Sequence, residues 1–154
     1  MRIVFLIMGA ALVCTTVTLL VYYGHAMQSS ADQPEGKIAL VRIAGITLRA
    51  EVADTEALRE QGLSGTNTLA DGTAMLFVFQ TDGAWGFWMK DMKYPLDIVW
   101  VNRNDEVVTI ARDVDPSTYP EAFYPSAPAR YALELPAGWA AAHSLADGSK
   151  IVLQ

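Results

Sequence analysis

The sequence predicts a mostly β fold, a small and mainly antiparallel barrel-like or rolled sheet with two short helices. About eight short runs rich in β-branched and aromatic residues follow Ile38. Gly, Pro, Asn and Asp separate these runs at short intervals, which favours antiparallel pairing of neighbouring strands. Two segments have the composition and flanking signals of helices, and both are too short to form without packing against the sheet.

The first half of the predicted domain contains a hairpin, a helix and a buried strand. Ala44-Gly45 separates two β-rich runs, and a two-residue gap with Gly is typical of a tight hairpin. Thr55 precedes a series of good helix formers that ends at Gly62, which together predict a capped helix. The expected elements are strands 38–43 and 46–52, a helix over 56–61 and a strand over 75–79.

The second half alternates strands with turns and one proline-rich loop. Pro95 interrupts a strand-like run, and the segment 102–105 has the composition of a turn. Four of the seven prolines lie in the segment 115–128, so little regular structure is expected there. The expected elements are strands 87–89, 96–101, 106–114, 130–135 and 150–153, with a short helix over 136–143.

The N-terminal segment, residues 1–26, predicts a transmembrane anchor or a signal peptide. Arg2 is followed by 21 residues without a charged side chain, Ile3–Tyr23, and a helix of that length reaches about 31 Å, enough to cross a bilayer. The length favours an anchor, whereas the small residues that follow offer a cleavage site. A linker over 27–37 and a folded domain over 38–154 come next. We therefore expect the domain on the periplasmic side, either anchored or released by cleavage.

Composition and charge exclude several classes of function. The chain has 11 Lys and Arg against 17 Asp and Glu, a net charge of −6, and it has no basic run, so nucleic-acid binding is not expected. Membrane contact is expected only through the N-terminal segment. The single cysteine, Cys14, lies in that segment, and no His, Asp or Glu spacing suits a metal. We therefore expect no metal, no cofactor and no catalytic residue.

The segment 87–100 is the main candidate for a site, since it mixes aromatic rings with lysines and aspartates. Polar groups among large apolar ones must find partners or stay hydrated. In one interpretation, Trp88, Lys90 and Asp97 line a crevice. In the other, Asp97 only caps its own loop by accepting hydrogen bonds from backbone N–H groups.

Glu134 is the second carboxylate of interest, in a predicted strand where it shares a face with Arg130. The simplest interpretation is a solvated strand face with an ion pair. The functional interpretation pairs Glu134 with Asp97 as an acid and base couple, which a glycoside hydrolase needs at a defined separation. The full set of candidate ligand-binding residues is Trp88, Lys90, Asp97, Arg59, Arg130 and Glu134.

Four ordered motifs carry a resemblance to a known family. They are Arg59-Glu60-Gln61-Gly62-Leu63, Met75-Leu76-Phe77-Val78-Phe79, Phe87-Trp88-Met89-Lys90 with Pro95-Leu96-Asp97-Ile98-Val99, and Tyr131-Ala132-Leu133-Glu134-Leu135-Pro136-Ala137-Gly138. From Ile43 to Leu153 the chain resembles the domain of unknown function 192 family. The resemblance implies a small exported or membrane-anchored β-rich protein, and it implies no reaction. The chain departs from the family pattern at Ser64 and at Asp91, which adds a negative charge beside Lys90.

Three functions fit these observations. The sequence favours a non-catalytic binding module for a small polar ligand, sugar or peptide in the cell envelope, because the candidate residues mix aromatic and charged groups. The first alternative is a hydrolase of envelope polysaccharide that uses Asp97 and Glu134. The second is a structural partner of an envelope complex, with the helix 55–61 or an exposed strand edge as the contact.

Overall fold

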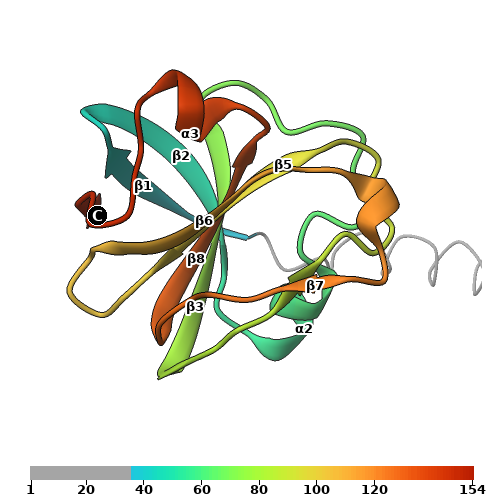
Figure 1. Ribbon diagram of the computed structural model, residues 1–154, viewed down its shortest axis with the longest axis horizontal. Coiled ribbons are helices and arrows are strands. Elements are labelled where there is room, and N and C mark those ends of the chain that lie inside the picture. The colour runs from blue at the N-terminus through green and yellow to red at the C-terminus, as the bar shows by residue number, and fades with distance from the viewer. Residues whose placement is uncertain (1–35) are drawn as a thin grey trace, which may run out of the picture. The chain divides into compact units, whose positions relative to one another are not determined.

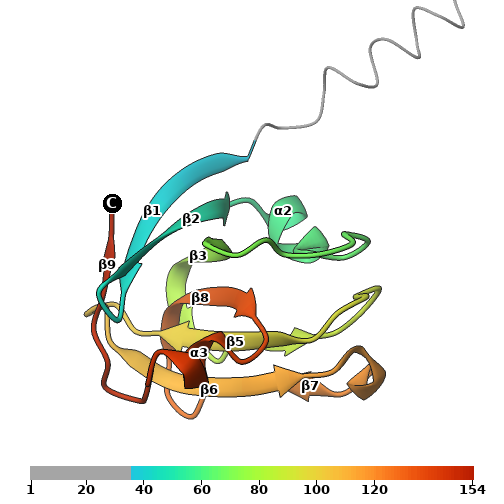
Figure 2. The ribbon, with the colours of Figure 1, turned by 90° about the horizontal axis from the view of Figure 1, so that it is seen from above.

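A seven-stranded sheet, curled into half a barrel, forms the centre of the domain (Figures 1 and 2). The computed structural model describes residues 36–154. The elements are β1 (Lys37–Ile43), β2 (Ile46–Ala53), α2 (Glu56–Gln61), β3 (Thr73–Gly83), β4 (Phe87–Trp88), β5 (Leu96–Val101), β6 (Val107–Val114), the 3-10 helix η1 (Pro116–Thr118), β7 (Ala122–Phe123), β8 (Ala129–Pro136), α3 (Trp139–Ala142) and β9 (Ile151–Leu153). The large sheet has the order β6-β5-β8-β3-β2-β1-β9, and β4 pairs with β7. The prediction of a mostly β fold with two short helices is confirmed.

The sheet stays open, so the expected barrel forms only in part. Its edge strands, β6 and β9, come together at a single bridge between Glu106 and Lys150, whose side chains also form an ion pair of 2.9 Å. Within residues 36–154 the two edges are not otherwise paired as strands. The fold is therefore a curled half-barrel and not a closed one.

The hairpin and the first helix form as the sequence predicts. Ile43 pairs with Ile46, and the two turn residues Ala44 and Gly45 have positive φ angles of 51° and 80°, as a tight type I′ hairpin turn requires. The hydroxyl of Thr55 accepts a hydrogen bond of 3.2 Å from the N–H of Leu58, which caps α2.

The pairing of β2 with β3 differs from the expected antiparallel pattern. These two strands are parallel, with Arg49 opposite Thr73 and Ala53 opposite Phe77. The chain between them carries α2 and a loop back to the start of the sheet, and such a crossover returns the next strand in the same direction. The prediction of antiparallel neighbours is wrong for this pair, because the sequence does not show that β2 and β3 become neighbours across the helix.

The sheet is covered on both faces, and each face has its own core. One core contains Leu133 and Val99 together with Ala140 of α3. The other contains Phe77, with Leu58 of α2 packed against its edge. All six residues of β5 are buried, because this strand lies inside the sheet and contributes side chains to both cores.

Asp97, on β5, is completely buried and bonds only to backbone N–H groups. Its Oδ1 accepts from Asp113 at 2.8 Å and from Gly138 at 3.2 Å, and its Oδ2 accepts from Ala140 at 2.7 Å. The first donor lies on β6, and the other two lie at the start of α3. The carboxylate therefore caps backbone groups, as one interpretation expects, but it joins two distant segments and does not cap its own loop.

Predictions for the N-terminal anchor or signal peptide and for most of the linker fall outside the described residues. Across residues 36–154, no helix combines the length and the apolar character needed to span a membrane.

Replacing Asp97 by Ala should strongly destabilise the fold. Three backbone donors, one buried and two part-buried, would lose their acceptor, and we expect the free energy of unfolding to fall by about 3 kcal/mol. Chemical denaturation checks this value. Asp115→Ala is the matched control, since that exposed carboxylate accepts a single backbone hydrogen bond, from Ser117, and its removal should have a much smaller effect. Equal losses in both variants would contradict the role assigned to Asp97.

Candidate functional site

A groove of about 630 Å³ opens along one end of the domain, and it is the candidate site. It lies between α2 with the residues that follow it, the end of β3, and the segment around β4. The helix and the small β4–β7 sheet occupy the same end of the domain (Figures 1 and 2). Its volume falls within the range typical of small-molecule sites, about 300–1,000 Å³.

Glu134 is the carboxyl group that lines the inner part of this groove. It lies on β8 in the interior of the sheet, with Met75 of β3 on one side and Ile98 of β5 on the other. Only 6% of Glu134 is exposed, and its Oε2 is buried with no hydrogen-bond partner within residues 36–154. The expectation of a solvated strand face with an ion pair is therefore wrong, because apolar neighbours enclose the side chain.

Burial raises the pKa of the Glu134 carboxyl from 4.5 to about 8. The charged form is disfavoured because apolar surroundings cannot replace the hydration of a carboxylate. At neutral pH the side chain is therefore mostly protonated and carries an O–H donor. The hydroxyl of Tyr94, whose pKa is raised mainly by burial and also by the Glu134 charge, bonds instead to Thr66 at 2.7 Å.

Aromatic rings form much of the groove wall. Phe79 stacks on Trp85 with ring centroids 4.4 Å apart, and Phe87 meets Phe77 edge to face at 4.8 Å. Trp88 lies farther out and is 53% exposed. These contacts explain why the segment 85–88 is held in place, although β4 itself is only two residues long.

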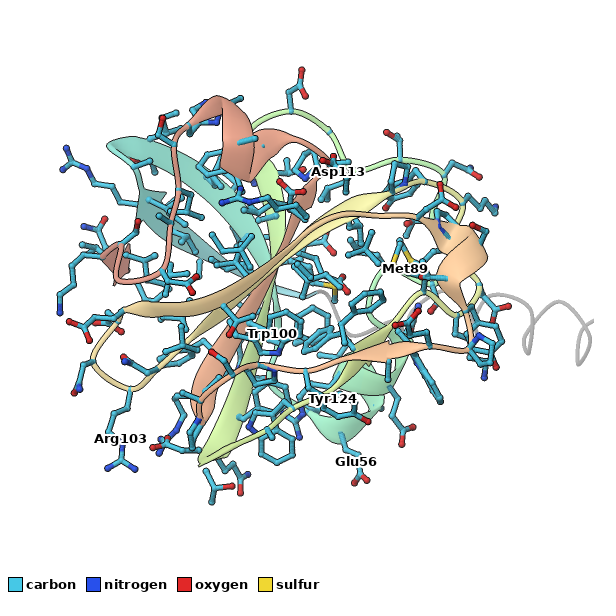
Figure 3. All side chains as sticks on the ribbon, in the orientation of Figure 1. Glu56, Met89, Trp100, Arg103, Asp113 and Tyr124 are labelled. Atoms are coloured by element: carbon cyan, nitrogen blue, oxygen red, sulfur yellow. The ribbon has the colours of Figure 1, made fainter. Side chains whose placement is uncertain are left out.

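Charged side chains surround the aromatic wall. The Arg59 guanidinium lies 5.5 Å from the centre of the Phe79 ring and donates a hydrogen bond of 2.9 Å to the Val78 carbonyl. Lys90 is exposed, and its backbone carbonyl accepts a bond of 2.9 Å from Ser64. Glu56 and Glu60 contribute negative charge from α2. Figure 3 shows Glu56 on α2.

The structure brings four of the six candidate residues to this groove: Trp88, Lys90, Arg59 and Glu134. Asp97 does not line it, because its carboxylate is enclosed and committed to backbone donors. Arg130 does not line it either. Its Nε donates to Asp82 at 2.7 Å, and Arg103 forms an ion pair with the same carboxylate. Figure 3 shows Arg103 well apart from Met89 and Glu56.

Asp97 and Glu134 lie on opposite faces of the sheet. Asp97 stands opposite Leu135 in the β5–β8 register, whereas Glu134 stands opposite Ile98. Directly opposed side chains share a face and successive ones alternate, so the two carboxyl groups point away from each other. A pair of carboxylates acting on one glycosidic bond must flank the same site, and these two cannot.

Sequence reasoning missed several groove residues, notably Phe79 and Trp85 in the wall and Glu60 on α2. Phe79 and Glu60 belong to the motifs that mark the family, but the sequence does not show that those motifs become neighbours in the fold. Trp85 is only partly exposed, whereas Trp88 is exposed. As for metals, residues 36–154 contain no cluster of three or more His, Cys, Asp or Glu side chains suited to an ion.

The chain belongs to the domain of unknown function 192 family. The family model, described as "Uncharacterized ACR", matches residues 39–153. This span takes in most of β1, every other strand of the curled sheet, the helix α2 and all the residues that line the groove. A comparison with curated proteins finds no match.

Two solved structures are similar to this domain. A protein of unknown function from Novosphingobium aromaticivorans has 28% identity and a TM-score of 0.73, covering 79% of this chain and 89% of its own. A proposed transcription regulator from Sinorhizobium meliloti has 28% identity and a TM-score of 0.72, covering 77% of this chain and 95% of its own. Both likenesses support the fold described above.

Replacing Glu134 by Gln should change how stability depends on pH. Between pH 4.5 and about 8 the unfolded carboxyl is ionised while the folded one keeps its proton, so the wild type should lose about 1.4 kcal/mol of stability per pH unit relative to Glu134→Gln. Below pH 4.5 both states are protonated and above about 8 both are ionised, so the difference should be constant there.

Denaturation curves at a series of pH values measure this difference. Glu51→Gln is the matched control, because it makes the same chemical change at an exposed residue of β2 that lies outside the groove. A wild-type curve that runs parallel to that of Glu134→Gln across this pH range would contradict the protonated, buried state of Glu134.

Proposed function

We propose that this domain is a non-catalytic binding module whose groove takes a small polar ligand. The observation that carries the proposal is that Glu134, whose Oε2 is buried without a hydrogen-bond partner within residues 36–154, is one of the residues that line the groove. A buried polar atom without a partner costs about 1–3 kcal/mol. A ligand that enters the groove and bonds this carboxyl would offset that cost.

The fold itself has no use for a carboxyl group at this position. Met75 and Ile98 flank it, and an apolar side chain of similar size would pack between them without any unsatisfied atom. Asp97 provides the contrast, since each of its oxygens accepts at least one backbone hydrogen bond. Glu134 is therefore a residue that destabilises the empty domain, as functional residues often do.

The walls of the groove support a ligand with both apolar and polar parts. Phe79 and Trp85 present aromatic surface, on which a sugar ring or an aliphatic chain could pack. Arg59 and Lys90 supply hydrogen-bond donors and positive charge. Sugars and peptides of the cell envelope remain the ligand classes we propose, with the envelope location resting on the uncharged segment Ile3–Tyr23.

Replacing Glu134 by Met should stabilise the ligand-free protein and abolish ligand binding. Removal of the unpartnered carboxyl should raise the free energy of unfolding at pH 8 by about 3 kcal/mol or more, because burial disfavours the ionised form that the unfolded chain has at this pH. A thermal-shift screen of sugars, cell-wall peptides and amino acids against the wild type should find a ligand that raises Tm, and Glu134→Met should lose that shift. Glu51→Gln should keep it, as a variant outside the groove.

Two outcomes would overturn the proposal. The first is a Glu134→Met variant that is less stable than the wild type at pH 8, since the carboxyl would then have a structural role. The second is a ligand whose thermal shift is the same in the wild type and in Glu134→Met, since binding would then occur away from this groove.

A further inference from the structure

The inner part of the groove offers a ligand a carboxyl group and no positive charge. Glu134 forms no ion pair within residues 36–154, where the four ion pairs involve other carboxylates. Its cross-strand neighbours, Met75 and Ile98, are apolar. Burial raises its pKa, because these apolar surroundings disfavour the charged form.

Aromatic rings line the groove together with Glu134. Phe77 and Phe87 both line the groove, and they meet edge to face at 4.8 Å. The face of an aromatic ring carries partial negative charge and attracts an ammonium group within about 6 Å of its centre. An ammonium group also has three donors, which suits a carboxylate whose oxygens are free.

The outer part of the groove carries charge of both signs, because the two glutamates of α2 line it together with two cations. Arg59 and Lys90 line it, and neither forms an ion pair with a carboxylate of residues 36–154. Arg59 uses one of its five donors on the Val78 carbonyl, which leaves the others available. Lys90 is exposed and belongs to a loop fixed by the Ser64 hydrogen bond.

We infer that the ligand carries a protonated amine, which becomes the counterion of Glu134, and an anionic group, which meets Lys90 and Arg59. This inference rests on the proposed function and narrows it to zwitterions of the amino-acid or peptide class. A neutral sugar would satisfy the carboxyl group with one hydrogen bond but would leave both cations of the outer groove without a partner.

Binding of an amine should release a proton from Glu134. At pH 7 the carboxyl is mostly protonated in the empty groove, and it must ionise to pair with an ammonium group. The affinity should therefore rise about fivefold from pH 7 to pH 8, about twofold more from pH 8 to pH 9, and little above that. The other titratable or charged groups that line the groove or influence Glu134 are Tyr94, Glu56, Glu60, Arg59 and Lys90.

Calorimetric titration of the full chain tests the inference. The probes are 6-aminohexanoate with both charges, hexylamine with the amine alone, hexanoate with the acid alone, and glucose as a neutral ligand. Titrations at pH 7 in phosphate and in Tris, which differ in ionisation enthalpy, measure the protons released. We expect 6-aminohexanoate to bind most tightly with release of nearly one proton, hexylamine to bind more weakly with the same release, and hexanoate not to bind.

Variants test the contacts of the amine end and of the anionic end of the ligand separately. Glu134→Gln should weaken both amines about tenfold or more and abolish proton release. Lys90→Gln should weaken 6-aminohexanoate about threefold and leave hexylamine unchanged. Lys93→Gln is the matched control, because Lys93 is exposed like Lys90, bonds Asn67 at 2.8 Å and does not line the groove, so both affinities should remain at the wild-type value.

The outcomes distinguish this inference from the proposed function. Tight binding of glucose or hexanoate without proton release, lost in Glu134→Met, would overturn the amine inference and leave the proposed binding module standing. Amine binding that is equal in the wild type and in Glu134→Gln would overturn the inference as well. If no polar ligand binds in a way that depends on Glu134, both the inference and the proposed function fail.

Discussion

The Asp97 carboxylate is the interaction on which the rest of the domain depends. It accepts backbone hydrogen bonds from Asp113 on β6 and from Gly138 and Ala140 at the start of α3. These hydrogen bonds join β5 to β6 and to the start of α3. They favour the register in which Asp97 stands opposite Leu135. A slip of one residue would turn every side chain of the strand to the other face. The register of β8 beside β5, which turns Glu134 toward the groove, thus depends on Asp97, a residue that does not line the groove.

Two buried carboxyl groups lie on adjacent strands and differ in their surroundings. Asp97 has three backbone donors, whereas Oε2 of Glu134 has no partner within residues 36–154. The first is a structural element, because a satisfied buried acceptor fixes the segments that bond to it. The second raises the free energy of the empty domain, because its apolar neighbours offer no donor. Both groups are buried, so it is the number of hydrogen-bond donors around each that separates their roles. Asp97 stabilises the fold, and Glu134 belongs to the groove.

The groove is preformed by contacts between segments that are far apart in the chain. The indole N–H of Trp100 donates to the Trp85 carbonyl at 2.8 Å, which holds the aromatic wall against the sheet. On the other side, Ser64 bonds the Lys90 carbonyl at 2.9 Å, which joins the loop after α2 to the loop after β4. A rigid site loses less conformational entropy when a ligand binds. Within residues 36–154, neither the Glu134 carboxyl nor the two cations that line the groove form an ion pair.

The sequence by itself determined most of the local structure, because hairpin turns, caps and apolar runs such as that of β5 act over a few residues. It also marked Trp88, Lys90, Arg59 and Glu134, since polar groups among aromatic ones need an explanation. Tertiary structure alone decided the parallel pairing of β2 with β3 and the opposite faces of the two carboxyls. Both depend on which strands become neighbours and in what register, and those long-range contacts leave no periodic signal along the chain.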